Sequence, residues 1–138
     1  MDSSTNRPGA GSERLKELIR KGTNLGTAPS DLVDILSELA GLSFFLGEQT
    51  AKAHAEYIRA EHTRKMAAAL CKHMAIIEGQ PIGKAEAQAE KDSSDQRLKE
   101  VEAHAEWYRL RVMRDDVAAV MDAIRTKISY LKHERQNA

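Results

Sequence analysis

An apolar periodicity that continues for roughly 40 residues, over about 95–133, constrains the fold of this chain more than any other feature. Apolar residues recur there at three- and four-residue steps, which is typical of one amphipathic helix. At 1.5 Å per residue such a helix measures roughly 60 Å, whereas a compact domain of this chain length is only about 30–35 Å across. The helix therefore needs a partner along its length, and an elongated hairpin or an oligomer provides one.

An earlier helix is predicted from Ser30, because a serine that follows a proline and precedes acidic residues is a favoured N-cap. An apolar stripe follows at helical spacing and consists of Leu32, Ile35, Leu39, Leu42 and Leu46. Gly41 and Gly47 each weaken a helix by about 1 kcal/mol relative to Ala, so we expect a bend or a break over 41–47. The side chains expected to fill that corner, or to meet a partner there, are Phe44 and Phe45.

The helical pattern continues over 48–77. Its inner stripe is predicted to consist of Ala53, Tyr57, Ala60, Ala67, Cys71 and Met74. Gly79 suits the left-handed position that ends many helices, a short helix is expected over 84–91, and Ser93 or Ser94 then starts the long last helix. The chain is thus predicted to be all-α: an elongated helical hairpin of two long helices with a short connecting helix, oligomerising through the C-terminal helix.

Residues 1–28 are predicted to be a flexible N-terminal tail, and residues 29–135 a helical domain. Ser, Gly, Asn and Thr dominate the tail, which is typical of segments that bury too little apolar surface to fold. A short helical turn over 12–21, with Leu15, Leu18 and Ile19 on one side, is expected only on contact with another surface. Deleting the tail is therefore expected to leave folding and assembly intact.

The long last helix carries two apolar stripes. The first consists of Leu98, Val101, Ala105, Tyr108 and Val112. The second consists of Leu110, Met113, Val117, Val120, Ile124, Ile128 and Leu131. Two stripes indicate two packing partners, so we expect the first to face the helix over 48–77 and the second to face another subunit. The predicted oligomer interface is Val117, Val120, Ile124, Ile128 and Leu131; the alternative is one wandering stripe in a bent helical bundle.

Composition narrows the classes of function. Lysine plus arginine and aspartate plus glutamate each total 21, so bulk charge gives no reason to expect a polyanionic partner. The one cysteine, Cys71, excludes an internal disulfide and suits a reducing compartment. No secretory signal is visible, and no apolar run reaches the roughly 20 residues that span a bilayer. We therefore expect a soluble, cytoplasmic protein with no membrane partner.

Patterns that carry catalysis or metal binding are missing from the sequence. The five histidines form no pair at a spacing of four and no Glu-x-x-His element. No glycine-rich phosphate loop follows a strand, and no serine stands in a nucleophile turn. The sequence predicts a protein that acts by binding, with no enzyme activity, no metal and no cofactor.

A heptapeptide recurs along the chain: residues 53–59 read AHAEYIR and residues 103–109 read AHAEWYR. Each copy places a histidine, an aromatic ring and an arginine within two helical turns. The repeat indicates either two related helices, or alanines that recur at a close helix crossing while the other matches are due to chance.

Basic residues lie at the end of the first copy and after it, on the same helix as Tyr57; they are Arg59, Arg64, Lys65 and Lys72. Arginine beside an aromatic ring can hold phosphates while the ring stacks on a base, as in single-strand binders that ignore sequence. The interleaved acids allow the other interpretation, which is a solvated charged face with local ion pairs.

Several segments together resemble the UvsY-like recombination mediators of tailed phages. They are residues 46–51 (LGEQTA), 83–89 (GKAEAQA), 107–110 (WYRL), 121–125 (MDAIR) and 128–132 (ISYLK). The resemblance covers about residues 31–135. It implies a ring-forming homo-oligomer in the cytoplasm of a bacterial host, which binds single-stranded DNA and helps to load a RecA-type recombinase while displacing the single-strand-binding protein. The DNA would lie on Arg59, Arg64, Lys65 and Lys72, with Tyr57 stacking.

The alternative function belongs to another class of protein. A non-enzymatic phage structural or assembly protein, or an adaptor, made of a helical hairpin accounts for the alanine-rich helices and the zero net charge without any nucleic acid.

Overall fold

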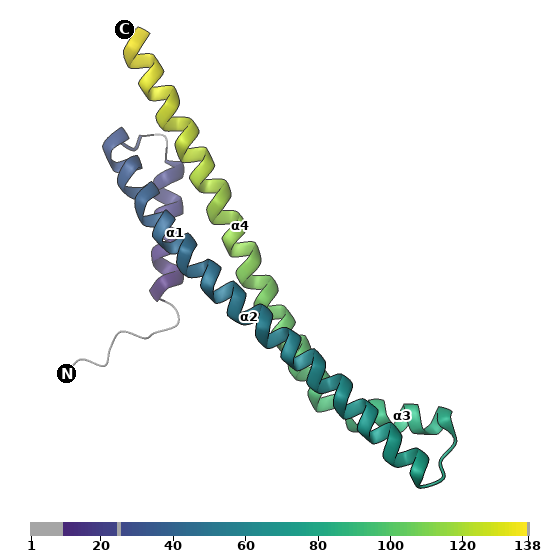
Figure 1. The fold of residues 1–138 in the computed structure, drawn as a ribbon. Helices are drawn as coiled ribbons and strands as arrows, with labels where there is room; N and C mark the ends of the chain where they lie inside the picture. The colour runs from purple at the N-terminus through teal and green to yellow at the C-terminus, as the bar shows by residue number, and fades with distance from the viewer. Residues whose placement is uncertain (1–9, 25, 138) are drawn as a thin grey trace, which may run out of the picture. The chain divides into compact units, whose positions relative to one another are not determined.

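The computed structural model describes residues 10–24 and 26–137, and it contains four helices within those ranges (Figure 1). They are α1 (Ala10–Thr23), α2 (Pro29–Ile77), α3 (Ile82–Asp92) and α4 (Ser94–Asn137). No described residue lies in a strand, so the predicted all-α class is confirmed. Residues 1–9 of the predicted tail lie outside the described residues. Among the described residues, no helix combines the length and the apolar composition that crossing a membrane requires.

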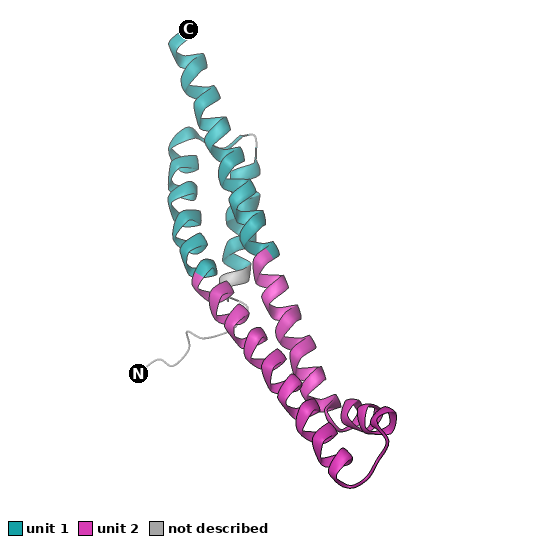
Figure 2. Ribbon diagram, turned by 45° about the vertical axis from the view of Figure 1, so that its right-hand side comes forward, with its two compact units in different colours: residues 1–47, 112–138 teal, residues 48–111 magenta. Residues whose placement is uncertain are grey.

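The chain divides into two compact units (Figure 2). Unit 1 comprises residues 1–47 and 112–138, and unit 2 comprises residues 48–111. Each long helix thus contributes one part to each unit.

Unit 1 is built from α1, residues 29–47 of α2 and residues 112–137 of α4, which lie side by side (Figure 2). Its buried apolar side chains are Leu15, Leu18, Leu32, Ile35, Leu39, Leu46, Val117, Met121 and Ile124. Gly22 permits a close approach of α1 to α4, because a Cβ at that position would lie 2.6 Å from Cδ1 of Ile124. The core of this unit therefore depends on three helices, the first of which lies within residues 10–23.

That first helix corrects the prediction of a tail over 1–28 for residues 10–23. Leu18 is 1% exposed and Leu15 is also buried, so the apolar side of α1 packs into the core of unit 1. Beyond the helix, Lys127 of α4 donates a hydrogen bond of 2.5 Å to the backbone oxygen of Asn24. The segment is thus bound to its own chain and needs no external surface to fold.

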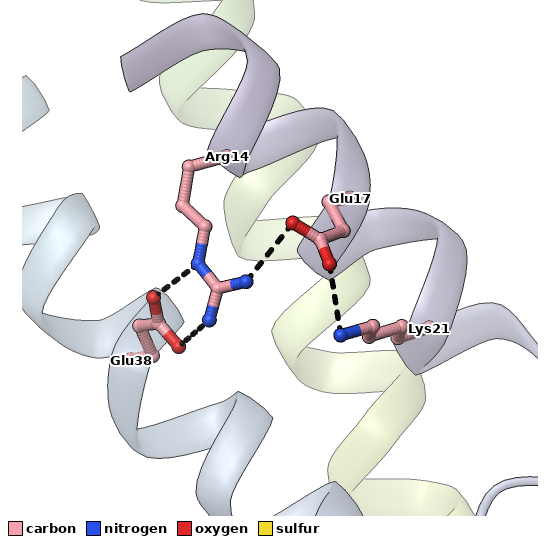
Figure 3. Close-up of polar contacts among 4 residues, drawn as sticks. All are labelled: Arg14, Glu17, Lys21 and Glu38. Carbon is pink, nitrogen blue, oxygen red and sulfur yellow. Dashed lines mark hydrogen bonds and ion pairs between the residues drawn. The ribbon is translucent and has the colours of Figure 1, made fainter. Parts of the chain in front are cut away.

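Ion pairs also join α1 to α2 within unit 1 (Figure 3). Arg14 donates from Nε and Nη2 to the two carboxylate oxygens of Glu38, at 2.6 and 2.7 Å, and from Nη1 to Glu17 at 3.0 Å. Lys21 lies 2.9 Å from the other oxygen of Glu17. The hydrogen bonds from Arg14 hold the pKa of the Glu38 carboxyl below its ordinary value, and those from Lys21 and Arg14 do the same for Glu17.

The start and the middle of α2 differ from the sequence predictions. The helix begins at Pro29, a residue whose fixed φ angle suits the first helical position, so Ser30 lies inside the helix and is not its N-cap. The expected break over 41–47 is absent, because α2 continues through Gly41 and Gly47. Phe44 and Phe45 are exposed, Phe44 by 82%.

Unit 2 is a helical hairpin in which residues 48–77 of α2 and residues 94–111 of α4 run antiparallel (Figure 1). At the end of α2 the Gly79 N–H donates to Ile76 and the Gln80 N–H to Ala75, at 3.0 Å each, and Gly79 has φ +87°. These bonds form a Schellman motif, which confirms the predicted role of Gly79. The short helix α3 and the start of α4 after Ser93 are also confirmed.

The inner side of α4 consists of one row of residues, whereas the sequence predicts two apolar stripes. In unit 2 the buried or half-buried side chains of this row are Ser93, Gln96, Glu100, Ala103, Trp107 and Leu110. In unit 1 they are Met113, Val117, Val120, Met121, Ile124, Ile128 and Leu131. The steps of three and four residues continue through both sets, so the alternative of a single stripe fits this helix better.

Both predicted partners of α4 therefore need correction. The first stripe, which was expected to face α2, is exposed along its whole length; Leu98, Val101 and Tyr108 are each 58% exposed. The second was expected to face another subunit, but Val117 and Ile124 are 0% and 1% exposed inside one chain. Val120, Ile128 and Leu131 are half-buried there. The interface prediction is wrong for Val117 and Ile124, while association of copies stays a prediction.

Candidate functional site

The two copies of the heptapeptide lie opposite each other in unit 2 and contact each other reciprocally. The His54 and Trp107 ring centres are 4.7 Å apart, and those of Tyr57 and His104 are 5.0 Å apart. The histidine of each copy thus packs on the aromatic ring of the other. Tyr57 and Trp107 also stack, with ring centres 5.6 Å apart and planes inclined by 10°.

Local sequence explains why these rings meet. Each histidine and its aromatic neighbour are three residues apart, so they share one side of a helix. Ala53 is buried and Ala103 is half-buried, and such small side chains let two helices approach closely. The antiparallel direction then brings the second position of one copy to the fifth position of the other. The repeat is therefore a contact within unit 2, which the sequence alone did not reveal.

A shallow cavity of about 280 Å³ adjoins this aromatic cluster. Its lining residues are Tyr57, Arg64, Arg97, Glu100, Val101 and His104. Arg64 donates a hydrogen bond from Nε to Glu100, and both side chains are largely buried. Arg97 forms no ion pair with any described residue. The cavity wall therefore carries one unbalanced positive charge beside a tyrosine ring.

The residues predicted to bind DNA do not form one open basic surface. Lys65 lies 2.8 Å from Glu61, and Lys72 lies 3.0 Å from Glu86 of α3. The hydrogen bond from Lys65 holds the pKa of the Glu61 carboxyl below its ordinary value. With Arg64 paired to Glu100, only Arg59 of the four predicted residues is left without an ion pair to a described residue. Tyr57 is half-buried in the aromatic cluster.

The outer face of α4 in unit 2 was missed as a site because its apolar residues were assigned to the interior. We call Leu98, Val101, Ala105 and Tyr108 the outer stripe. On the neighbouring edge lie Arg97, His104 and Arg111, which are also exposed. The guanidinium carbon of Arg111 lies 5.9 Å from the centre of the Trp107 ring. The signal that the sequence offered was the seven-residue spacing of these three residues.

The same unit exposes a second apolar set on α2, which consists of Met66, Leu70, Met74 and Ile77. Its four side chains are at least half exposed. Met74 was predicted to lie in the inner stripe, but Ala75 takes the buried position at that turn. Large apolar side chains thus lie on the outside of both long helices in unit 2.

The groups at this site are guanidinium, imidazole, carboxylate and tyrosine side chains. Among the described residues, no group of three or more histidine, cysteine, aspartate or glutamate side chains is placed to hold a metal ion. Guanidinium groups, two imidazole rings and a tyrosine ring can hold anions or stack on planar groups. Comparison with known proteins found no matching family model, curated protein or solved structure.

Proposed function

We propose that this protein is a non-enzymatic adaptor or assembly protein, which binds other polypeptides through the exposed apolar faces of unit 2. The observation that carries the proposal is the exposure of the outer stripe and of the apolar set on α2. Contiguous exposed apolar surface marks interaction sites in folded proteins. Covering it by a partner is favourable by roughly 25 cal/mol for each Å² removed from water.

The charges of unit 2 support a protein partner over a nucleic acid. Three of the four basic residues predicted to hold phosphates already hold carboxylates. Displacing a carboxylate partner offsets part of the gain from each phosphate contact. Apolar contacts are free of this cost, since Leu98 and Leu70 are exposed in the single chain.

Affinity purification from the cells that encode the protein tests the proposal. We expect the full chain to retain specific polypeptides that the variant Leu98→Glu plus Tyr108→Glu loses. Both positions are exposed, so the substitutions should change the free energy of unfolding by no more than about 0.5 kcal/mol each, which circular dichroism checks. Lys99→Glu is the matched control on the same helix and should retain the polypeptides. Equal retention by the unmodified chain and the double variant would contradict the proposal.

A second candidate function is that of a single-stranded DNA-binding recombination mediator, acting as a homo-oligomer that assists loading of a RecA-type recombinase. One observation favours it: Tyr57, Arg64 and Arg97 line the same cavity. A base could stack on the tyrosine while Arg97 holds a phosphate.

Fluorescence anisotropy with a labelled oligothymidine at two salt concentrations tests this candidate. Binding should weaken steeply with salt, and Arg97→Ala should reduce it while Lys99→Ala, its neighbour on the opposite side of α4, has a smaller effect. Absence of binding at low salt removes the mediator function and leaves the adaptor function in place.

A further inference from the structure

The outer face of α4 has an apolar centre and one basic edge. The outer stripe, Leu98, Val101, Ala105 and Tyr108, follows steps of three and four residues and so lies along one side of the helix. This side is opposite the inner row that contains Ala103, Trp107 and Leu110. Over residues 98–108 it extends for about three helical turns, or roughly 15 Å.

Three residues at seven-residue spacing form the basic edge, which we define as Arg97, His104 and Arg111. Residues spaced by seven form a line along a helix, and this line runs directly beside the outer stripe. Neither arginine forms an ion pair with a carboxylate among the described residues. The basic edge therefore offers two guanidinium groups that have no carboxylate partner among the described residues.

The opposite edge of the stripe is mixed in charge. Arg109 donates two hydrogen bonds to Glu106, at 3.0 and 2.7 Å, and this pairing raises the pKa of Arg109 and lowers that of Glu106. Glu102 lies on the same edge. The face is thus asymmetric, with uncompensated positive charge on one side only.

We propose that this face docks an amphipathic helix of another polypeptide, whose apolar stripe is bordered by a row of acidic side chains. The inference rests on the proposed adaptor function and names the chemistry of its partner. Apolar side chains of the docked helix cover the outer stripe, and its acidic row pairs with the basic edge, as the flanking charges of a coiled coil do. The cavity between Tyr57 and Arg97 lies at that edge and has room for one long acidic side chain.

Charge also bears on whether a second copy fits this face. If two copies paired antiparallel through the outer stripe, their basic edges would face each other and place Arg97 near Arg111 of the other copy, which is unfavourable. A parallel pair would place the basic edge against the mixed edge. An acidic helix satisfies both arginines, and sedimentation equilibrium of the arginine variants separates it from a parallel pair.

Fluorescence anisotropy with two labelled helical peptides tests the inference on the full chain. Each peptide has about three heptads with Leu at positions a and d and Gln at e; one carries Glu at every g position and the other Lys. We expect the Glu peptide to bind at least ten times more tightly than the Lys peptide, and its affinity to fall as salt is added. Arg97→Glu plus Arg111→Glu should weaken the Glu peptide at least tenfold and strengthen the Lys peptide.

The matched control is Lys91→Glu plus Lys99→Glu, which changes the net charge of unit 2 equally at exposed positions away from the basic edge. It should leave the preference for the Glu peptide intact. Equal binding of the two peptides, or no effect of the arginine reversals, overturns the inference. A dimer in sedimentation equilibrium that the arginine reversals dissociate also overturns it, because the occupant is then a second copy.

The outcomes separate this inference from the proposed function. If the outer-stripe variant loses its cellular polypeptides while the two peptides bind equally, the adaptor function stands and the acidic partner is wrong. If the Glu peptide is preferred but purification retains no polypeptide, the face recognises acidic helices and the adaptor function is wrong.

Discussion

In unit 1 the buried apolar side chains are leucine, isoleucine, valine and methionine, whereas in unit 2 four of the five are alanines. Unit 2 exposes most of its large apolar side chains, mainly on α2 and α4. A buried leucine contributes about 1.5–3 kcal/mol, and an alanine contributes much less because it buries one methyl group. The same two long helices thus bury large aliphatic side chains mainly in unit 1, although Phe44 and Phe45 are exposed there too.

This difference indicates that the two units contribute differently to stability, although they share the same two long helices. Unit 1 has the three-helix core that stabilises a fold, together with the ion pairs of Arg14. Unit 2 has a thin interior, in which ring stacking and the Arg64–Glu100 pair replace aliphatic packing. Substitutions of the same chemical type should therefore have different effects in the two units.

The largest difference is expected between two leucine truncations. Leu18→Ala in unit 1 should lower the free energy of unfolding by about 2–5 kcal/mol, because it leaves a cavity in a packed core. Leu70→Ala in unit 2 removes the same atoms from a side chain that is 63% exposed, and should change it by no more than about 0.5 kcal/mol. Urea denaturation followed by circular dichroism measures both.

The same pair of variants tests whether α1 is part of the fold. A loss at Leu18 no larger than that at Leu70 would mean that residues 10–23 behave as the tail that composition indicated. With α1 packed as described, deleting residues 1–28 should lower the melting temperature markedly, in contrast to the expectation from sequence.

A second contrast concerns glycines, one in a packed helix contact and one open to solvent. Gly22→Ala should lower the free energy of unfolding by about 1–2 kcal/mol, because the clash with Ile124 outweighs the gain in helix propensity. Gly41→Ala, which has nothing within 4 Å of its added Cβ, should raise it by up to about 1 kcal/mol. Urea denaturation of each variant provides the values.

Removing the clashing methyl group gives the control for Gly22. In a background of Ile124→Val, which lacks Cδ1, the cost of Gly22→Ala should shrink. If Gly22→Ala stabilises the protein as much as Gly41→Ala does, α1 does not approach α4 as closely as the structure places it.

Features set by neighbouring residues were predictable from the sequence. Gly79, the start of α4 after Ser93 and the presence of a short helix before it follow from local backbone rules, and the structure confirms them, although α3 covers Ile82–Asp92 where 84–91 was predicted. The packing of α1 was not predictable, because the partner of Gly22 is Ile124, more than 100 residues later. Only the tertiary structure shows that the short apolar side of residues 12–21 has a place to bind.

The candidate site, like the fold, was predictable from the sequence only in part. The repeat of residues 53–59 and 103–109 was visible, but its reciprocal contacts depend on the antiparallel register of α2 and α4. The apolar stripe from Leu98 was visible too, yet it was assigned to the interior because apolar residues usually face a core. The actual inner row contains Gln96, Glu100 and Ala103, and a polar and small row of this kind does not stand out by hydropathy.

The aromatic cluster provides a smaller contrast, within unit 2. A double-mutant cycle of Tyr57→Leu and Trp107→Leu should give a coupling free energy of about 0.5–1.5 kcal/mol, because the two rings stack. Tyr108→Leu, next to Trp107 but on the outer stripe, should couple to Tyr57→Leu by no more than about 0.5 kcal/mol. Chemical denaturation of the single and double variants gives both values. Equal coupling in the two cycles would show that the rings do not stabilise the hairpin through their contact.

The smallest expected effect is a pH dependence confined to unit 1. Hydrogen bonds from Arg14 lower the pKa of Glu38 from its ordinary value of 4.5, so the native state favours the ionised carboxylate. The pair therefore contributes stability above pH 4.5, and this contribution is lost as the pH falls through the lowered pKa.

Glu38→Gln removes the charge at every pH. It should melt a few degrees at most below the unmodified chain at pH 7, since both side chains of the pair are exposed, and the difference should vanish in acid. Arg14→Gln breaks the same pair and also removes the hydrogen bond to Glu17, so it should lower the melting temperature at pH 7 at least as much, and the double variant should lose little more than Arg14→Gln alone. A melting-temperature difference that persists unchanged in acid would instead mean that Glu38 stabilises unit 1 by packing against α1 and not by its charge.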